Sequence, residues 1–462
     1  MTSKDLKGCV WFAMSQTEHQ GDGIDDGNSI DADGIHQCFS KARRSLDEQP
    51  LSYWDDVVTN LQRQYGMATI HLPMEIQELH ERAFQVARKA LNKVRSTSSS
   101  NDKNHGSDAS VTVRMIQEGD DSAHATGYHC AGGSNSMSRY NEYREGFVFS
   151  NGETFQVPLN SRHQQIGRQR DLEECQEENF EYIMKNLFET SLHGICNHIL
   201  LAIERKLQLP MNYFQNSMGP TNTCSQWHIK RYVVGVNDQQ ENNIKVDRNV
   251  EQESEQQHQH HRHRENIEET EPKVLLPTHT DPSLISIVIH DQKGCNQHPN
   301  GLQYYAVPQP RDTNPASSHS SASTSPKPTT LSTIATDSAE ASTAKRCWMD
   351  IPYSGHAVAT IFVGSILSYI TGSSGDVLTT SFPSVKHRVI QTSESVGKDN
   401  GNGRMAITLF VRPQPSSILQ ILPSPLLTHV KKVKRQGMTF HEWNTRVSKN
   451  YMKKSTKNTR EK

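Results

Sequence analysis

Three residues in the second half of the chain have the types and spacing of a metal site. His279 and Asp281 flank a single residue, so on an extended strand both side chains point to the same face. An imidazole nitrogen and a carboxylate oxygen can then take adjacent positions around one ion. His387, in a distant β-branched segment, is the candidate for the third ligand. Two histidines and one carboxylate on one side of an ion leave the other side open, as in non-haem iron(II) centres.

The His-x-Asp pair alone does not establish a metal site, because the chain contains 23 histidines. The alternative is a loop histidine beside a turn aspartate. A histidine-rich tract at 258–263 also has metal-ligating side chains, but no carboxylate stands at ligand spacing beside it. Adventitious nickel or zinc binding is therefore favoured for that tract. The prediction at residues 279, 281 and 387 depends on elements that bring them together.

Residues 216–415 have the pattern of a double-sheet sandwich or jelly roll. Short segments rich in β-branched and aromatic residues, bounded by Gly, Pro and Asn, predict strands at 226–236, 274–277, 284–289, 301–307, 357–363, 384–390 and 404–412. Many short strands favour this architecture over alternating strands and helices. Two low-complexity insertions, 238–271 and 308–345, are too polar to bury a core and are expected outside the sandwich.

Residues 49–215 are predicted to be mainly helical, with a loop insertion near 96–126. Apolar residues at helical spacing predict helices at 54–61, 74–94 and 179–209, with a strand at 67–72. Residues 1–48 are polar and aperiodic and are predicted to be disordered. Residues 416–462 are predicted to be a basic tail with a helix at 439–452. Phe147 and Phe149 are predicted to face the core, with the substrate mouth as the alternative.

Composition narrows the class of protein. Hydrophobic residues make up 33% of the chain and the formal net charge is −2, so nothing at this level indicates nucleic acid or a membrane surface. Eight scattered cysteines without a CxxC pair favour reduced thiols inside the cell. The sequence begins without a signal-peptide pattern, and its most apolar stretch, 357–370, is too short and interrupted to span a membrane. We expect a soluble cytoplasmic protein, with the nucleus as the alternative because of the basic run at 431–435.

From about residue 53 to 413 the chain resembles the plant-type 2-oxoglutarate/Fe(II)-dependent dioxygenases, the isopenicillin N synthase-like superfamily. The matching stretches occur in the family's order: Leu207-Gln-Leu-Pro210, Tyr213-Phe214, Pro277-Thr-His-Thr-Asp281, Gly301-Leu-Gln303, Val363-Gly-Ser-Ile-Leu-Ser368, Thr371-Gly-Ser373 and His387-Arg-Val-Ile390. The resemblance implies a mainly β fold with flanking helices around a double-stranded β-helix (jelly-roll) core. It also implies iron(II) at His279, Asp281 and His387, with 2-oxoglutarate and dioxygen as co-substrates.

The residues that would hold 2-oxoglutarate match the family in part. Arg404 falls where the family has an arginine for the distal carboxylate, a pairing that suits a guanidinium. The family's Arg-x-Ser, however, reads Arg404-Met-Ala406, so a hydroxyl is absent; Thr408 on the same strand face could replace it or could simply pack. The family's Asn-x-Tyr reads Lys230-Arg-Tyr232. Tyr232 can still offer its phenol, whereas Lys230 replaces a neutral amide by a cation, so either change could weaken 2-oxoglutarate binding or mark a different organic acid.

The resemblance implies oxidation of a small organic metabolite, hydroxylation in the first place, coupled to decarboxylation of 2-oxoglutarate to succinate and carbon dioxide. Two alternatives stay open. One is a related iron oxidase that does not use 2-oxoglutarate, which the loss of the serine favours and Arg404 opposes. The other is a non-catalytic interaction protein on the same fold, which the complete triad opposes. We expect a small-molecule substrate and neither nucleic acid nor membrane as a partner; the sequence predicts no oligomeric state.

Overall fold

The computed structural model describes residues 32–63, 65–99, 127–129, 143–150, 183–219, 225–233, 272–291, 301–306, 346–351, 355–372, 381–391, 404–427 and 437–447. The predicted insertions 238–271 and 308–345 lie outside these residues. So do the predicted loop from residue 100 to 126, the histidine-rich tract and the basic run at 431–435.

The largest element is an antiparallel sheet in which segments from the whole chain meet. Its strands, in spatial order, are β1 (Met67–His71), β9 (Val358–Val363), β6 (Ile285–His290), β11 (Met405–Val411), β4 (Gln226–Tyr232), β3 (Arg144–Ser150) and β2 (Gly127–His129). Gly66 precedes β1 with a φ of +87°, and an added Cβ would lie 1.9 Å from the Pro383 carbonyl oxygen. Only glycine therefore fits this entry into the sheet.

A second, smaller antiparallel sheet contains β5 (Val274–His279), β10 (His387–Ile390), β7 (Leu302–Ala306) and β8 (Cys347–Asp350) in that order. From β5 onward the chain passes back and forth between the sheets: β6, β9 and β11 belong to the large sheet, and β5, β7, β8 and β10 to the small one. This alternation is the strand order of the predicted double-stranded β-helix. A short pair, β12 (Ile418–Leu419) and β13 (Met438–Thr439), follows β11.

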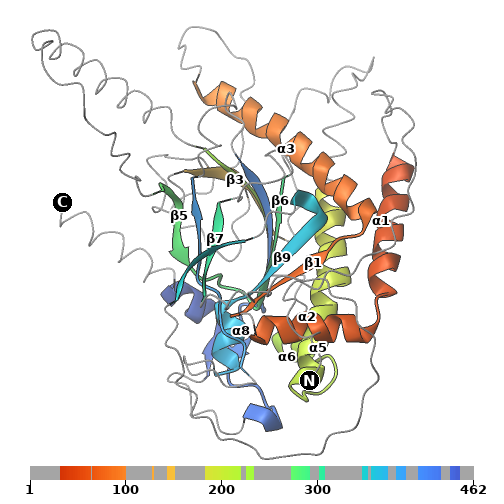
Figure 1. Ribbon diagram of the computed structural model, residues 1–462, viewed down its shortest axis with the longest axis vertical. Coiled ribbons are helices and arrows are strands. Elements are labelled where there is room, and N and C mark those ends of the chain that lie inside the picture. Colours follow the sequence, from red (N-terminus) through yellow and green to blue (C-terminus); the bar gives the residue numbers. More distant parts are fainter. Residues whose placement is uncertain are drawn as a thin grey trace, which may run out of the picture.

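Helices pack against the large sheet on the side away from the small one (Figure 1). The helical elements are α1 (Ala32–Asp47), α2 (Leu51–Arg63), α3 (Met74–Ser99), the π-helix η2 (Leu192–Cys196), α5 (Asn197–Lys206), α6 (Tyr213–Met218) and α8 (Ser365–Ile370), with 3-10 turns η4 (Gly355–Ala357) and η6 (Pro425–Leu427). Of these, α8 lies at one end of the sheets (Figure 1). Residues 183–191 and 440–447 are also helical. No helix in the described part of the chain is long and apolar enough to cross a membrane.

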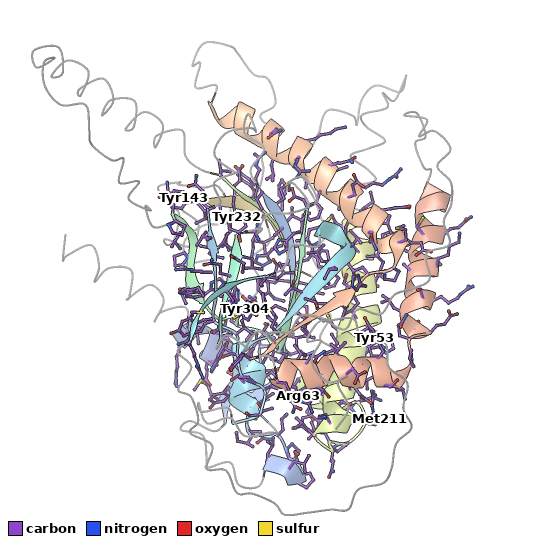
Figure 2. All side chains as sticks on the ribbon, in the orientation of Figure 1. Tyr53, Arg63, Tyr143, Met211, Tyr232 and Tyr304 are labelled. Atoms are coloured by element: carbon purple, nitrogen blue, oxygen red, sulfur yellow. The ribbon has the colours of Figure 1, made fainter. Side chains whose placement is uncertain are left out.

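The strands of the large sheet are buried on both faces, and β11 shows how the two faces differ. Met405, Ile407 and Leu409 pack into the main core with the helices. Ala406 and Thr408 alternate with them and face the small sheet instead. A second apolar cluster fills this inner space, bordered by Tyr232 and Tyr304 from the two sheets (Figure 2). The inner face therefore mixes apolar and polar side chains, which is where a site can form.

Every predicted strand overlaps a strand of the structure, but the helix α1 and the strands β2, β3, β8, β12 and β13 were not predicted. The prediction that residues 1–48 are disordered is wrong for α1, because Phe39, Ala42 and Leu46 are buried against the rest of the core. Strand β8 was also missed; its residues alternate in type too weakly to stand out. Phe147 and Phe149 are buried in the main core, as predicted, and neither lines the inner cavity.

Candidate functional site

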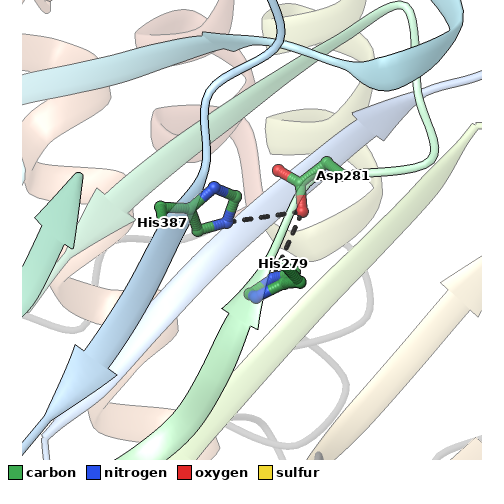
Figure 3. A group of neighbouring side chains, drawn as sticks. All are labelled: His279, Asp281 and His387. Atoms are coloured by element: carbon green, nitrogen blue, oxygen red, sulfur yellow. Dashed lines mark ion pairs between the residues drawn. The ribbon is translucent and has the colours of Figure 1, made fainter. Parts of the chain in front are cut away.

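The three predicted metal ligands come together at one end of the small sheet (Figure 3). His279 ends β5, His387 begins β10, and the antiparallel register pairs the two residues directly. Their imidazole centroids lie 4.2 Å apart. The Asp281 Oδ1 atom lies 3.6 Å from Nε2 of His279 and 3.5 Å from Nε2 of His387. The three ligand atoms all lie within 4.8 Å of one another, close enough to hold one ion.

Backbone carbonyl groups fix the orientation of both imidazoles. Nδ1 of His279 lies 2.9 Å from the Pro277 oxygen, and Nδ1 of His387 lies 3.2 Å from the Val385 oxygen. A carbonyl only accepts, so Nδ1 carries a hydrogen in each ring, and Nε2 is the nitrogen that faces Asp281 and can ligate a metal. Such partners behind metal-binding histidines set the tautomer and the ring orientation. Phe362 adds a stacking contact on His387, at 4.8 Å between ring centroids.

Asp281 is held by its backbone and ionised at its side chain. The Ser365 N–H and hydroxyl both donate to the Asp281 carbonyl oxygen, each at 2.8 Å. Burial opposes ionisation, but the two facing imidazoles outweigh it and hold the pKa of the Asp281 carboxyl below its usual range. Burial, followed by the charge of His387, lowers the pKa of His279 to about 3. An ionised Asp281 carboxylate and a neutral His279 imidazole are the ligand forms that a divalent cation requires.

One atom of this cluster tests whether the site suits a cation. Among the described residues, Oδ2 of Asp281 is buried and has no hydrogen-bond partner. An unsatisfied buried carboxylate oxygen is costly, and a bound divalent ion would neutralise the carboxylate. The donor set, two imidazoles and one carboxylate, suits iron(II) and other first-row ions. The residues present therefore fit a metal.

The triad opens into a cavity between the two sheets. Its other lining residues are Leu276, Leu302 and Val389 from the small sheet and Lys230, Tyr232, Val288, His290, Phe362, Arg404, Ala406, Thr408 and Phe410 from the large sheet side. The structure thus brings all three predicted co-substrate residues, Arg404, Tyr232 and Thr408, to the same cavity as the triad. Arg404 lies 5.3 Å from the Tyr232 ring centroid. Burial raises the pKa of the Tyr232 phenol, which stays a neutral donor.

His290 is a residue of this cavity that the sequence did not predict. Arg404 Nη2 donates to its Nδ1 at 3.0 Å, and since arginine cannot accept, Nδ1 is unprotonated and Nε2 carries the hydrogen. Burial and the charge of Arg404 lower the pKa of His290 well below its usual value, so the ring is neutral. Within the described residues, the buried Nε2 has no hydrogen-bond partner. It is available to a ligand as a donor.

Strand register places His290 beside the position where the family resemblance expects a serine. His290 on β6 is the direct partner of Ala406 on β11, where the family resemblance expects a serine. On the other side of β11, Lys230 is the direct partner of the same Ala406. A small side chain therefore stands between a histidine and a lysine, all three facing the cavity. The only sequence signal for His290 was a polar residue at the end of a mostly apolar strand.

Comparison with known proteins gives a likeness of fold. No protein-family model and no curated protein matches the chain. A full-length Neurospora crassa protein, solved in complex with alpha-KG (2-oxoglutarate), has a TM-score of 0.50 at 13% identity, covering 86% of this chain and 90% of that one. A 2OG-Fe(II) oxygenase family protein from Caulobacter crescentus gives 0.47 at 14% identity, over 86% and 95% of the two chains. A dioxygenase for auxin oxidation from rice gives 0.43 at 12% identity, over 87% and 91%.

The likeness to the Neurospora structure confirms the predicted jelly-roll fold. At this level of identity it is a likeness of fold alone. The narrower plant-type, isopenicillin N synthase-like resemblance stays a prediction, and the chemistry must be argued from the cavity itself.

Proposed function

We propose that the protein is an iron(II)- and 2-oxoglutarate-dependent dioxygenase that oxidises, in the first place hydroxylates, a small organic metabolite. The observation that carries this proposal is the shared cavity. A triad of two histidines and one carboxylate lies on one sheet, and an arginine suited to a carboxylate lies on the other. The solved structure of similar fold from Neurospora was determined with alpha-KG, which supports the same co-substrate here.

The metal ligands and Arg404 have distinct parts in this proposal. His279, Asp281 and His387 hold iron(II) from one side and leave its other positions open. Arg404 pairs with the distal carboxylate of 2-oxoglutarate, because a guanidinium forms bidentate, charge-assisted bonds with carboxylates. When bound together here, iron(II), 2-oxoglutarate and dioxygen would supply the oxidant, with 2-oxoglutarate ending as succinate and carbon dioxide.

His290 supports the use of 2-oxoglutarate despite the missing serine. Its Nε2 hydrogen can donate to the carboxylate that Arg404 binds, which replaces the lost hydroxyl from the neighbouring strand. Tyr232 offers a phenol at the same end, and Thr408 offers a second hydroxyl further along β11. The alternative, an iron oxidase that needs no 2-oxoglutarate, has no such use for an arginine buried beside a donor-bearing histidine.

We test the proposal by anaerobic titration of metal-free protein with iron(II) and then 2-oxoglutarate. The readout is the visible charge-transfer absorption of the iron–2-oxoglutarate chelate. We expect a band that is absent in His279→Ala and needs much more 2-oxoglutarate in Arg404→Ala. Iron binding without a band would favour the oxidase, and absence of iron binding would exclude the enzyme.

A further inference from the structure

Lys230 is the cation of the cavity that the proposed function does not use. It is 5% exposed, and among the described residues it has no hydrogen bond or ion pair. Its ammonium lies over the Phe410 ring, 4.8 Å from the centroid. A buried ammonium is retained only where something compensates the loss of water. An aromatic face compensates in part, and an anionic ligand would compensate more fully.

The ammonium points away from the end that holds 2-oxoglutarate in the proposed function. Arg404 and Phe410 are six residues apart on β11, which separates their Cα atoms by about 20 Å. Arg404 is turned toward His290 and Tyr232, whereas Lys230 reaches toward Phe410. The two cations thus serve different parts of one cavity. The metal triad lies on the opposite wall of the same cavity.

The charges of the loaded site leave Lys230 uncompensated. Iron(II) and the dianion of 2-oxoglutarate neutralise each other, and Asp281 and Arg404 do the same. Lys230, which is 5% exposed, then adds one positive charge to the site. Burial, and after it the charge of Arg144 on the neighbouring β3, lower the pKa of Lys230 well below its usual value, so the charged form needs an anion nearby. A negative charge on the remaining ligand, the substrate, would supply that anion.

We propose that Lys230 binds an anionic group of the substrate, a carboxylate in the first place, beside the open side of the metal. This inference rests on the proposed function, which it extends to a substrate class: small organic acids. Phe410, together with Val288 and Phe362 on the same wall, offers apolar contacts to the rest of such a molecule. A carboxylate anchored at Lys230 would present its carbon skeleton to the metal while Arg404 binds 2-oxoglutarate.

The test compares benzoate with benzamide, which have nearly the same shape and differ in charge. Full-length protein is loaded anaerobically with iron(II) and saturating 2-oxoglutarate, so that Arg404 is occupied, and each probe is titrated by calorimetry. We expect wild-type protein to bind benzoate at least about tenfold more tightly than benzamide, because only benzoate forms a charge-assisted bond. Lys230→Met should lose this preference, whereas Lys185→Met, an exposed lysine on helical residues 183–191, should keep it.

Several results would overturn the inference. The first is that wild-type protein binds benzoate and benzamide equally well, or binds neither. The second is that Lys230→Met keeps the wild-type preference for benzoate. A Lys230→Met variant with an unchanged benzoate preference and at least about tenfold weaker 2-oxoglutarate binding would assign Lys230 to the co-substrate. Thermal unfolding checks that Lys230→Met is folded, and Lys230→Gln takes its place if it is not.

The test also separates this inference from the proposed function. If no iron–2-oxoglutarate band forms, the proposed function fails, and the probes are titrated into metal-free Arg404→Met instead. A benzoate preference that still depends on Lys230 would support the anion site on its own. No preference in that protein would overturn it.

Discussion

Replacing His290 tests the most specific step in the co-substrate argument. His290 accepts a hydrogen bond from Arg404 and offers Nε2 as a buried donor. His290→Leu keeps the volume and removes both functions. A hydrogen bond to a charged group contributes about 1.5–3 kcal/mol, so its loss should raise the half-saturating 2-oxoglutarate concentration by roughly tenfold to a hundredfold. Iron(II) binding should change little, because His290 is not a ligand.

The assay is the anaerobic 2-oxoglutarate titration, followed by the visible band, with thermal unfolding as a check on folding. Ala406→Ser supplies the matched rescue, because Ala406 is the direct register partner of His290 and its serine would restore the family's hydroxyl. The double variant should recover part of the lost affinity. A folded His290→Leu protein with half-saturation within about twofold of wild type would refute the assigned role, since the lost bond predicts at least about tenfold.

Three further predictions concern the metal and the scaffold. Iron(II) at a hundredfold excess over its dissociation constant should stabilise the protein by about 2.7 kcal/mol; a chelator should reverse the rise in unfolding temperature, and His387→Ala should abolish it. Arg231→Met should lower the free energy of unfolding in urea by about 3–5 kcal/mol, because it leaves the Glu145 carboxylate buried without its cation. In the wild-type protein, Oε1 of Glu145 accepts a hydrogen bond from Nε of Arg231 at 2.6 Å. Adding Glu145→Leu to Arg231→Met should recover much of the lost stability. Glu204→Ala should cost about 1–3 kcal/mol by the same method, since its carboxylate accepts two backbone N–H groups at the start of α6; an unchanged urea midpoint would contradict that role.

The sequence predicted the parts of the site that lie on strong local patterns. The His-x-Asp spacing places His279 and Asp281 on one face wherever a strand forms, and the alternation along β11 places Arg404 and Thr408 together. Bringing His387 against His279 required the register of β5 with β10. Register depends on contacts across the sheet and is not written in either strand alone. The family resemblance, rather than the pattern, supplied that pairing.

The missed features depended on long-range contacts. α1 has a narrow apolar stripe, Phe39, Ala42 and Leu46, in a polar segment, and it is stable because these residues pack against other helices. A lone His290 at the end of an apolar strand carries no local sign of its partner. Its relation to Arg404 follows only from the pairing of β6 with β11. Both features are tertiary in origin, so local propensity could not reveal them.

The two departures from the family pattern and the one unpredicted residue form a single row across the large sheet. Lys230, Ala406 and His290 stand side by side on β4, β11 and β6. The alanine stands between the lysine, which reaches toward Phe410, and the histidine, which meets Arg404. The loss of the serine and the gain of the lysine therefore fall at directly paired positions. Because residues in contact are not additive in their effects, restoring the serine alone should not recreate the family's usual site while Lys230 and His290 remain.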